Sequence, residues 1–347
     1  MHVRNVSLAA AVLLFLVVPL IRAIDGTEPP SAAVAGRPPS VRTSPPTRIS
    51  KVADLKEVNY YPASAGWTFM WTRFEPTSID RDFARIHALG ANTVRIIIQP
   101  GVFGFPAVRP VMADHLSSVI GMAAKHSLRV HLTLFDWWSR YGDIRGSKAW
   151  VTSLLSRYKD DPRIAVVELH NEISPRDHKA MAWVRTMLPY LSTVLPGTLQ
   201  TVSAPSVRPD EFALFIRELK HSPPDFWDYH YYGPPGAAYS VLSRIKSLAA
   251  GRPLFIGETG YSTDRMPADQ HAQEQAQAAY YRAVFTAAAE LNLPAPAPWI
   301  LNDFPHGAIP PHSPAAHKPA QYGYGLFRVN GTPKPAAAIV SRTFSGK

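Results

Sequence analysis

Residues 164–172 read IAVVELHNE, and this stretch decides the fold class because an apolar, β-branched run gives way to polar residues at its end. A continuous apolar run of this length predicts a strand that is buried on both faces of a parallel sheet. Similar runs recur along the chain on either side of it. Strands are predicted at residues 66–71, 93–99, 129–136, 164–170, 201–204, 226–232, 253–258 and 297–303.

Helical segments separate these strands. They are predicted at residues 79–89, 114–125, 147–158, 177–195 and 269–291, where apolar residues recur every three or four positions. Eight strand–helix units in this length predict an α/β protein with a single (β/α)8 TIM barrel. The alternative is an open doubly wound sheet, which usually carries a glycine-rich phosphate turn after its first strand. No such turn is present in this sequence.

A leader and a linker are expected before the barrel. Residues 6–21 carry no charge and are too short for an ordinary membrane span. Residues 1–23 are therefore predicted to be a signal peptide or an uncleaved anchor. Residues 24–51 are rich in proline and read as a disordered linker, with the barrel domain over 52–347. The expected location is therefore secreted or at the cell envelope. Association with a membrane or the cell wall would occur through the N-terminal segment.

Composition narrows the function classes. The chain has no cysteine, which excludes disulfides, thiolate metal sites and a cysteine nucleophile. Its formal charge of +10 is concentrated partly in the leader, and the remaining basic residues form no run that would favour nucleic acid as a partner. The thirteen histidines show no compact metal-binding spacing, so we expect no catalytic metal. We also expect that the protein needs no cofactor and is a monomer.

The chemistry is expected at one rim, because the active site of a (β/α)8 barrel lies at the carboxyl ends of its strands. Glu172 and Glu258 end two of the predicted strands, and two carboxylates are what glycoside hydrolysis requires. One must protonate the leaving oxygen while the other attacks the anomeric carbon or activates water. The other candidates at this rim are Arg95, Asp136, Asn171, His230, Tyr232 and Trp299.

These motifs make the sequence resemble the clan A glycoside hydrolases, most closely the cellulase-like and mannanase-like enzymes of glycoside hydrolase family 5. The matching segments are ELHNE at 168–172, FIGETG at 255–260 and GANTVR at 90–95. The His-x-Tyr at 230–232, Trp299 and the ending GLFRVNGTPKP at 325–335 also match. The resemblance extends from about residue 66 to about residue 338.

The resemblance implies a retaining mechanism, with Glu172 as acid/base and Glu258 as nucleophile. Arg95 and Tyr232 would hold the nucleophile, and Asn171 would bind the 2-hydroxyl of the sugar. His230 would contact the acid/base or the sugar, and Trp299 would form the floor beneath the sugar. The pKa of Glu172 is expected to be raised by an apolar setting and a neighbouring carboxylate.

Three residues and two segments leave the family pattern or stand outside it. Asp136 lies where the family often has histidine or asparagine, and is expected either to bind a sugar hydroxyl or to pack. Glu168 is expected to be a buried partner of Arg95, and His131 to be a core histidine. The segments at 100–113 and 303–324 are long enough to wall off one end of the site.

The expected partner is an oligo- or polysaccharide, and the expected function is hydrolysis of a β-linked glucan or mannan by double displacement. Two alternatives remain open. One is an exo-acting glycosidase or transglycosylase on envelope glycans, which would need a pocket rather than an open cleft. The other is a carbohydrate-binding barrel without catalysis, for which two paired glutamates have no use.

Overall fold

The computed structural model describes residues 50–249, 251–264 and 269–346, all of which belong to one compact unit, Thr43–Lys347. The predicted leader at 1–23 and nearly all of the predicted linker lie outside the described residues, so both stay predictions. Among the helices that the structure describes, none has the length and apolar character needed to cross a membrane.

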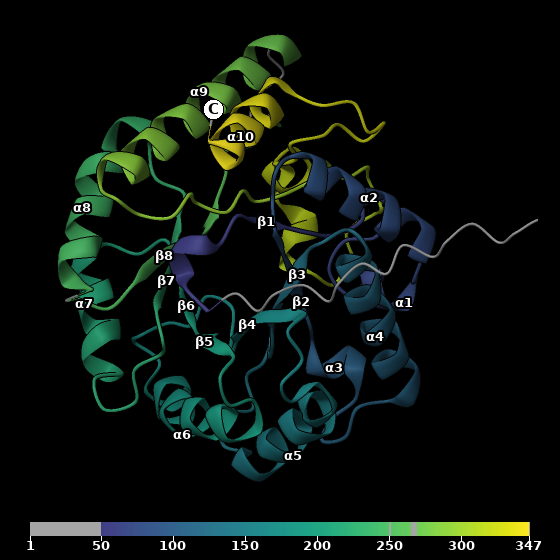
Figure 1. The fold of residues 1–347 in the computed structure, drawn as a ribbon, viewed down its shortest axis with the longest axis vertical. Coiled ribbons are helices and arrows are strands. Elements are labelled where there is room, and N and C mark those ends of the chain that lie inside the picture. Colours follow the sequence, from purple (N-terminus) through teal and green to yellow (C-terminus); the bar gives the residue numbers. More distant parts are fainter. Residues whose placement is uncertain (1–49, 250, 265–268, 347) are drawn as a thin grey trace, which may run out of the picture. The chain divides into compact units, whose positions relative to one another are not determined.

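Eight parallel strands form two hydrogen-bonded groups at the centre of the domain (Figure 1). The first group runs in the order β1-β2-β3-β4-β5 and the second in the order β6-β7-β8. Their bounds are β1 Glu57–Asn59, β2 Thr93–Ile97, β3 Arg129–Thr133, β4 Ile164–Glu168, β5 Leu199–Thr201, β6 Ser203–Ala204, β7 Trp227–Tyr231 and β8 Leu254–Thr259.

Two junctions close these groups into a barrel. Strands β5 and β6 are separated by Val202 alone and pair with different neighbours, so together they occupy one barrel position. At the other junction, residues 297–301 lie between β8 and β1: Thr259 bridges Pro298, and the Asn59 amide donates to the Pro298 carbonyl at 3.1 Å. The predicted (β/α)8 barrel is thereby confirmed, with residues 297–301 in the eighth position.

The helices surround the strands in Figure 1 and cover their outer faces. The apolar faces that the sequence periodicity predicted pack inward, as in α5, where Trp150 and Val151 are fully buried. The helices are α1 Phe69–Thr72, α2 Pro76–Ala88, α3 Pro100–Phe103, α4 Pro110–Lys125, α5 Ile144–Leu155, α6 His178–Val194, α7 Pro209–Glu218, α8 Ala238–Leu248, α9 Gln270–Glu290 and α10 Pro335–Ser345.

The prediction of a first strand at 66–71 was wrong. This aromatic stretch turns at Trp67, which has a φ of 47°, and continues as the short helix α1. The first barrel strand is β1, which begins nine residues before the predicted start; it was missed because it is short and begins with the charged residue Glu57. Aromatic residues are enriched in strands because they suit half-buried surfaces, and here α1 supplies that burial: Trp71 is fully buried and its indole donates to the Ile97 carbonyl.

The eighth strand was predicted as continuous over 297–303, but only isolated bridges form there. Proline has no amide hydrogen to donate to a ladder, and Pro298 lies within this segment. The remaining pairing still fixes the chain well enough to place Trp299 at the carboxyl rim of the barrel.

Candidate active site

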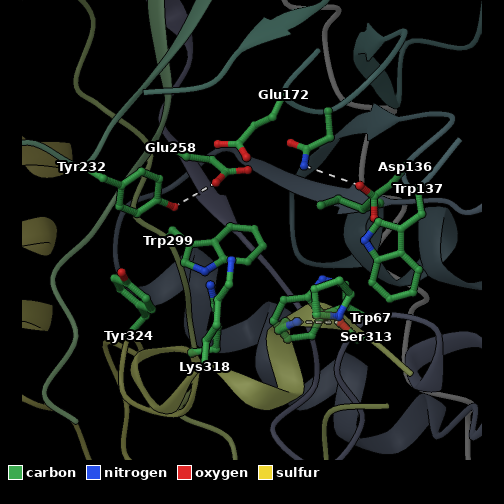
Figure 2. A pocket seen from close by; sticks show the side chains of 15 residues that line it. Trp67, Asp136, Trp137, Glu172, Tyr232, Glu258, Trp299, Ser313, Lys318 and Tyr324 are labelled. Atoms are coloured by element: carbon green, nitrogen blue, oxygen red, sulfur yellow. Dashed lines mark hydrogen bonds between the residues drawn. The ribbon is translucent and has the colours of Figure 1, made fainter. Parts of the chain in front are cut away.

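A cavity of about 320 Å³ opens at the carboxyl ends of the strands (Figure 2). Both predicted catalytic glutamates line it, and aromatic side chains surround them. The lining residues are Trp67, Ile97, Asp136, Trp137, Asn171, Glu172, Tyr232, Glu258, Trp299, Ser313, Pro314, Ala315, Lys318, Gln321 and Tyr324.

Glu258 lies within β8 and is held from two sides. The Arg95 guanidinium, on β2, donates through Nη1 to Oε1 of Glu258, and the Tyr232 hydroxyl donates to Oε2 at 2.8 Å. Arg95 is itself fixed by Asn59, whose Oδ1 accepts from the same Nη1 at 2.8 Å. Two donors that favour an ionised carboxylate thus converge on the residue predicted to be the nucleophile.

Glu172 projects from the loop after β4, four residues beyond the last strand residue. Its φ of 49° lies in the left-handed region, which is uncommon for a residue with a side chain. The backbone amide of Glu172 donates to Ser203 Oγ at 2.8 Å, which ties this turn to β6. The side chain, 38% exposed, faces the cavity and accepts a hydrogen bond from His230 Nδ1 at 2.9 Å.

The two carboxylates lie close together. One oxygen of each, together with a ring nitrogen of His230, falls within 4.8 Å of the others. His230 Nδ1 is 3.5 Å from Glu258 Oε2, so this nitrogen faces both glutamates. Such a short oxygen-to-oxygen separation fits the spacing of about 5–5.5 Å in retaining enzymes and not the 6.5–9.5 Å of inverting ones.

The pKa values of this trio differ from the sequence expectation for Glu172. Burial of His230 lowers its pKa, but the negative charges of Glu258 and Glu172 outweigh this and raise it to about 9. Burial raises the pKa of Glu172, yet the hydrogen bond and charge of His230 and the charge of Arg95 bring it below its usual value. The prediction that the pKa of Glu172 is raised was therefore wrong, because it left out a protonated His230. Burial is the largest cause that raises the pKa of Glu258 above its usual value.

Asn171 and Asp136 form a polar part of the cavity lining. Asn171 accepts from Arg95 Nη2 at 2.8 Å through its Oδ1, which turns its Nδ2 toward Asp136 Oδ1 at 3.4 Å. Gln99 donates to the other oxygen of Asp136 at 3.1 Å. Burial raises the pKa of Asp136 to about 6. The structure thus places Asp136 in the site lining and within its hydrogen-bond network.

Trp299 lies in the middle of the cavity in Figure 2, with Trp67 and Tyr324 beside it. Its ring meets that of Trp67 edge to face, with 6.1 Å between the ring centroids. Trp67 lies in the segment 66–71, which was wrongly predicted to be the first strand. It lines the cavity from the turn before α1.

One of the two long segments walls the cavity, as expected. Residues 313–324 supply Ser313, Lys318, Gln321 and Tyr324 to the lining, whereas no residue of 100–113 lines it. The segment is anchored from below by Lys334, whose Nζ donates to Asp303 Oδ1 at 2.8 Å and to the Gly323 carbonyl at 3.2 Å. Sequence reasoning missed Lys318 and Tyr324, because loop residues carry no periodic signal that shows their direction.

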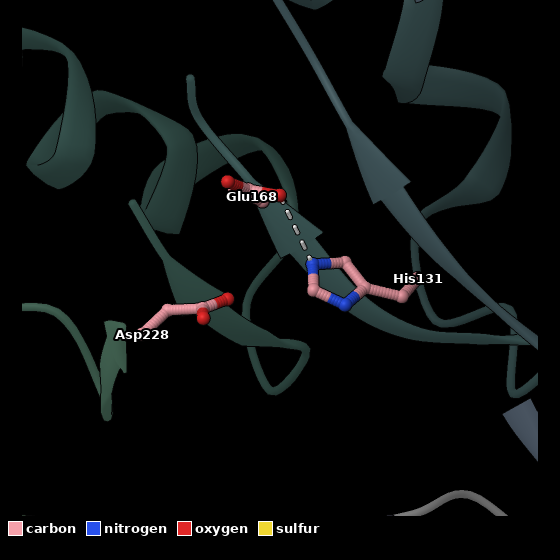
Figure 3. Close-up of side chains that lie close together, drawn as sticks. All are labelled: His131, Glu168 and Asp228. Atoms are coloured by element: carbon pink, nitrogen blue, oxygen red, sulfur yellow. Dashed lines mark ion pairs between the residues drawn. The ribbon is translucent and has the colours of Figure 1, made fainter. Parts of the chain in front are cut away.

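A charged layer lies beneath the site, inside the barrel. Glu168 accepts from Arg95 Nε at 2.8 Å, which confirms the predicted buried pair. His131 is fully buried, as expected of a core histidine, and its Nδ1 is 2.9 Å from Glu57 Oε2. Figure 3 shows His131 Nε2 facing Glu168, 3.6 Å away, with Asp228 nearby.

Two trios among the described residues bring possible metal ligands within 4.8 Å of one another: His131 with Glu168 and Asp228, and Glu172 with His230 and Glu258. In the second trio, a protonated His230 donates a hydrogen bond to Glu172. The first trio neighbours the Arg95 guanidinium, which already compensates the charge of Glu168.

No protein-family profile and no curated protein matches this sequence. Solved structures do match: a GH5_18 variant from Streptomyces cattleya, in complex with Manβ1-4GlcNAc, superposes with a TM-score of 0.65 over 83% of this chain and 79% of its own, at 21% identity. The barrel has the fold of glycoside hydrolase family 5.

Two further structures support this. A GH5_18 protein from Bifidobacterium longum subsp. longum gives a TM-score of 0.69 at 17% identity, over 84% of this chain and 79% of its own. An exo-β-1,4-mannosidase from Opitutaceae bacterium strain TAV5 gives 0.67 at 18% identity, over 84% of this chain and 59% of its own. The resemblance that the motifs predicted is confirmed at the level of the fold.

Proposed function

We propose that this chain is a retaining glycoside hydrolase that cleaves β-linked glycans by double displacement. The observation that carries the proposal is the pair Glu172 and Glu258, with carboxylate oxygens within 4.8 Å and different partners. Glu258 accepts hydrogen bonds from Arg95 and Tyr232, which suit an anion, whereas Glu172 accepts one from the protonated His230. The matched structures include glycosidases that act on β-linked sugars, which supports the same reading.

In the first step, a carboxylate oxygen of Glu258 attacks the anomeric carbon, and the bond from this carbon to the leaving oxygen breaks. The leaving oxygen takes a proton from Glu172. In the second step, Glu172 removes a proton from water, which attacks the same carbon and releases Glu258 from its ester. The configuration at the anomeric carbon is inverted twice and so retained.

His230 supplies the proton that the low pKa of Glu172 would otherwise withhold. The charge of Glu258 is the largest influence that raises the pKa of His230. This charge disappears as the ester forms, so the proton on His230 becomes more acidic at the moment when Glu172 must donate. The proton passes across the 2.9 Å contact from Nδ1 to Glu172 Oε1 and on to the leaving oxygen, which leaves Glu172 as a carboxylate and His230 neutral. In the second step, the proton that Glu172 takes from water returns to His230.

The size of the cavity favours action at a chain end. Its volume of about 320 Å³ is at the lower end of the usual range for small-molecule sites, about 300–1,000 Å³. Residues 313–324 wall it on one side. A pocket of this kind suits the terminal sugar of a glycan, which makes the exo-acting alternative the better one.

The first test is Glu258→Gln, assayed on aryl β-glucosides and β-mannosides and on β-linked oligosaccharides. We expect turnover to fall by about 10⁴-fold or more while sugar binding persists, since removing a nucleophile removes the covalent step. Glu290→Gln, an exposed acid-to-amide change at the end of α9, is the matched control and should retain wild-type turnover. Near-normal turnover in Glu258→Gln would remove the nucleophile assignment.

The acid/base assignment is tested in the same assay with Glu172→Ala. This variant should still hydrolyse dinitrophenyl glycosides, whose leaving groups need little protonation, and added azide should raise its rate by taking the vacant place. A folded Glu172→Ala protein that azide does not rescue would contradict the role given to Glu172.

A further inference from the structure

A single lysine lines the cavity that holds the two catalytic glutamates. Lys318 belongs to residues 304–324, a segment that contains three histidines and no acidic residue. Figure 2 shows Lys318 beside Tyr324 and next to Trp299, with Trp299 between it and the two carboxylates. The cavity therefore has an anionic end at the catalytic pair and a cationic end at Lys318.

The ammonium group of Lys318 has no partner among the residues that the structure describes. Other cations near the site are paired: Arg95 with Glu168 and Glu258, and Lys334 with Asp303. The catalytic carboxylates are likewise occupied, Glu258 by Arg95 and Tyr232 and Glu172 by His230. Among the described residues, no acidic side chain compensates the charge of Lys318, which faces a cavity that a ligand would fill.

The backbone of Lys318 is held by hydrogen bonds, so the fold fixes the point in the cavity wall from which its side chain extends. Lys318 lies between two short 3₁₀ helices, η4 Pro314–His317 and η5 Pro319–Tyr322. Its amide donates to the Ala315 carbonyl at 3.1 Å, and its carbonyl accepts from Gln321 at 2.9 Å. The Tyr322 hydroxyl adds a hydrogen bond to the Ala316 carbonyl at 3.0 Å.

A neutral sugar would be a poor ligand for this arrangement. A ligand that covers Lys318 removes water from an ammonium group, which is costly unless the ligand brings an opposite charge. An uncharged donor would bind the hydroxyl groups of a neutral sugar equally well. A carboxylate, by contrast, forms a charge-assisted hydrogen bond with an ammonium group.

We propose that the pocket binds a sugar that carries a carboxylate, of the uronic acid class, with that carboxylate on Lys318 and the sugar ring on Trp299. This inference rests on the proposed function, because it names the substrate of the same site. The substrate would be the acidic end of a β-linked glycan. Lys318 would act as a specificity-determining residue and would take no part in bond cleavage.

The test compares acidic and neutral probes in the full chain. Binding of sodium D-glucuronate and D-glucose is measured by NMR titration, and hydrolysis is measured with 4-nitrophenyl β-D-glucuronide and β-D-glucoside. We expect the acidic member of each pair to be preferred by tenfold or more in the wild-type protein, as for a hydrogen bond between charged groups. Lys318→Met should bring the ratio of acidic to neutral close to one, and Lys318→Arg should retain most of it.

Lys159→Met is the matched control, because Lys159 is an exposed lysine at the end of η2, Ser156–Tyr158, on the side of the barrel where β4 begins. It should keep the wild-type preference. Equal binding of the two probes by the wild-type protein, or a preference that survives in Lys318→Met, would overturn the inference. Hydrolysis of neutral glycosides alone would do the same and leave the proposed function standing. Selective glucuronate binding that depends on Lys318, without hydrolysis of any glycoside, would support the binding site and remove the hydrolase.

Discussion

Arg95 is the residue on which the site depends. Its guanidinium joins the charged layer inside the barrel to the cavity above, with Glu168 below and Glu258 and Asn171 above. It is fully buried, and the charges of Glu168 and Glu258 raise its pKa despite the opposing effect of burial. A permanently charged group in this position fixes both the orientation and the ionisation of the proposed nucleophile.

Glu168→Gln tests this role of Arg95. The change leaves the shape of the side chain but removes the charge that holds Nε and Nη2, so Arg95 should move and Glu258 should lose part of its support. We expect a lower kcat with little change in KM, and an acid limb of the pH–rate profile that moves to higher pH. Breaking a buried ion pair should also cost about 3–5 kcal/mol of unfolding free energy.

The pH profile separates positioning from mere stability. A variant that is less stable but has an unchanged acid limb would show that Glu168 supports the fold alone. Glu274→Gln is a suitable comparison, since it removes the ion pair of Glu274 with Arg328, away from the cavity lining, and should leave the profile unmoved.

At this scale the sequence predicted which residues meet but not how protons are placed. Strand ends in a parallel barrel share one rim, so Glu172, Glu258 and Arg95 could be brought together from their positions alone. The pKa of Glu172 depends on a histidine from a strand 58 residues away, and its sign was predicted wrongly for that reason. Lys318 was missed because its position in the cavity wall is set by loop hydrogen bonds that have no sequence period.

Among the elements, β1 shows how burial overrides local character. It is a three-residue strand beginning with Glu57, yet all three residues are buried because it lies between β2 and residues 297–301. The aromatic stretch at 66–71 has the stronger strand propensity and forms a turn and α1 instead. The five helices with predicted ranges, α2, α4, α5, α6 and α9, were predicted to within a few residues, since their apolar periodicity reflects the same burial that the structure shows.

Helix α6, which follows the Glu172 loop, has a well-formed N-terminus. Asp177 accepts hydrogen bonds from the amides of Lys179 and Ala180, each at 3.0 Å. Replacing Asp177 with alanine leaves these amides without a side-chain partner and should lower the unfolding free energy by about 1 kcal/mol. Thermal or urea unfolding measures the change.

Asp210→Ala is the comparison for that change, because Asp210 lies in the first turn of α7 and makes only an exposed ion pair with Arg208. It should cost clearly less than Asp177→Ala. Equal losses in the two variants would show that charge near a helix start, and not the capping bonds, stabilises α6.

For the barrel as a whole, the buried charges predict how stability changes with pH. The charge of Glu258, with the hydrogen bond and charge of Glu172, outweighs burial and raises the pKa of His230 to about 9 from 6.5, so its contribution is complete below pH 6.5 and is lost as the pH rises through 9. Burial and the charge of Glu168 raise the pKa of Asp228 to about 7, which also reduces stability as the pH rises from about 4 to 7.

Glu168 acts in the opposite direction. Burial raises its pKa, but Arg95 and the neighbouring histidines lower it to about 2, so its contribution is complete above pH 4.5 and is lost as the pH falls toward 2. The Asp228 loss begins at about the pH where the Glu168 contribution is nearly complete, so we expect the highest melting temperature at about pH 4–5, with a decline from there toward pH 9. A melting temperature that rises steadily from pH 6 to 9 would contradict this distribution of charge.

The whole fold was more predictable than its closure. Eight alternating units indicate a barrel because each strand must be covered by the helix that follows it. The sequence could not show that the last position would be filled by a proline-containing segment with isolated bridges. The buried pair of Glu168 and Arg95 was predicted, but not that Glu57 and His131 join the same charged layer, since this becomes visible only when the strands lie side by side.

The closure also sets the order in which the molecule is completed. The Asn59 side chain and the Pro298 carbonyl that it contacts are 239 residues apart in the chain. At the usual rate of about 5–20 residues per second, a ribosome needs roughly 10–50 s to make the intervening segment. During that time the outer edge of β1 has no neighbour, and an unpaired strand edge invites association with other chains. High-level expression should therefore depend on chaperones that shield nascent chains, and slower translation should increase the loss of protein, because it lengthens the time during which this edge is open.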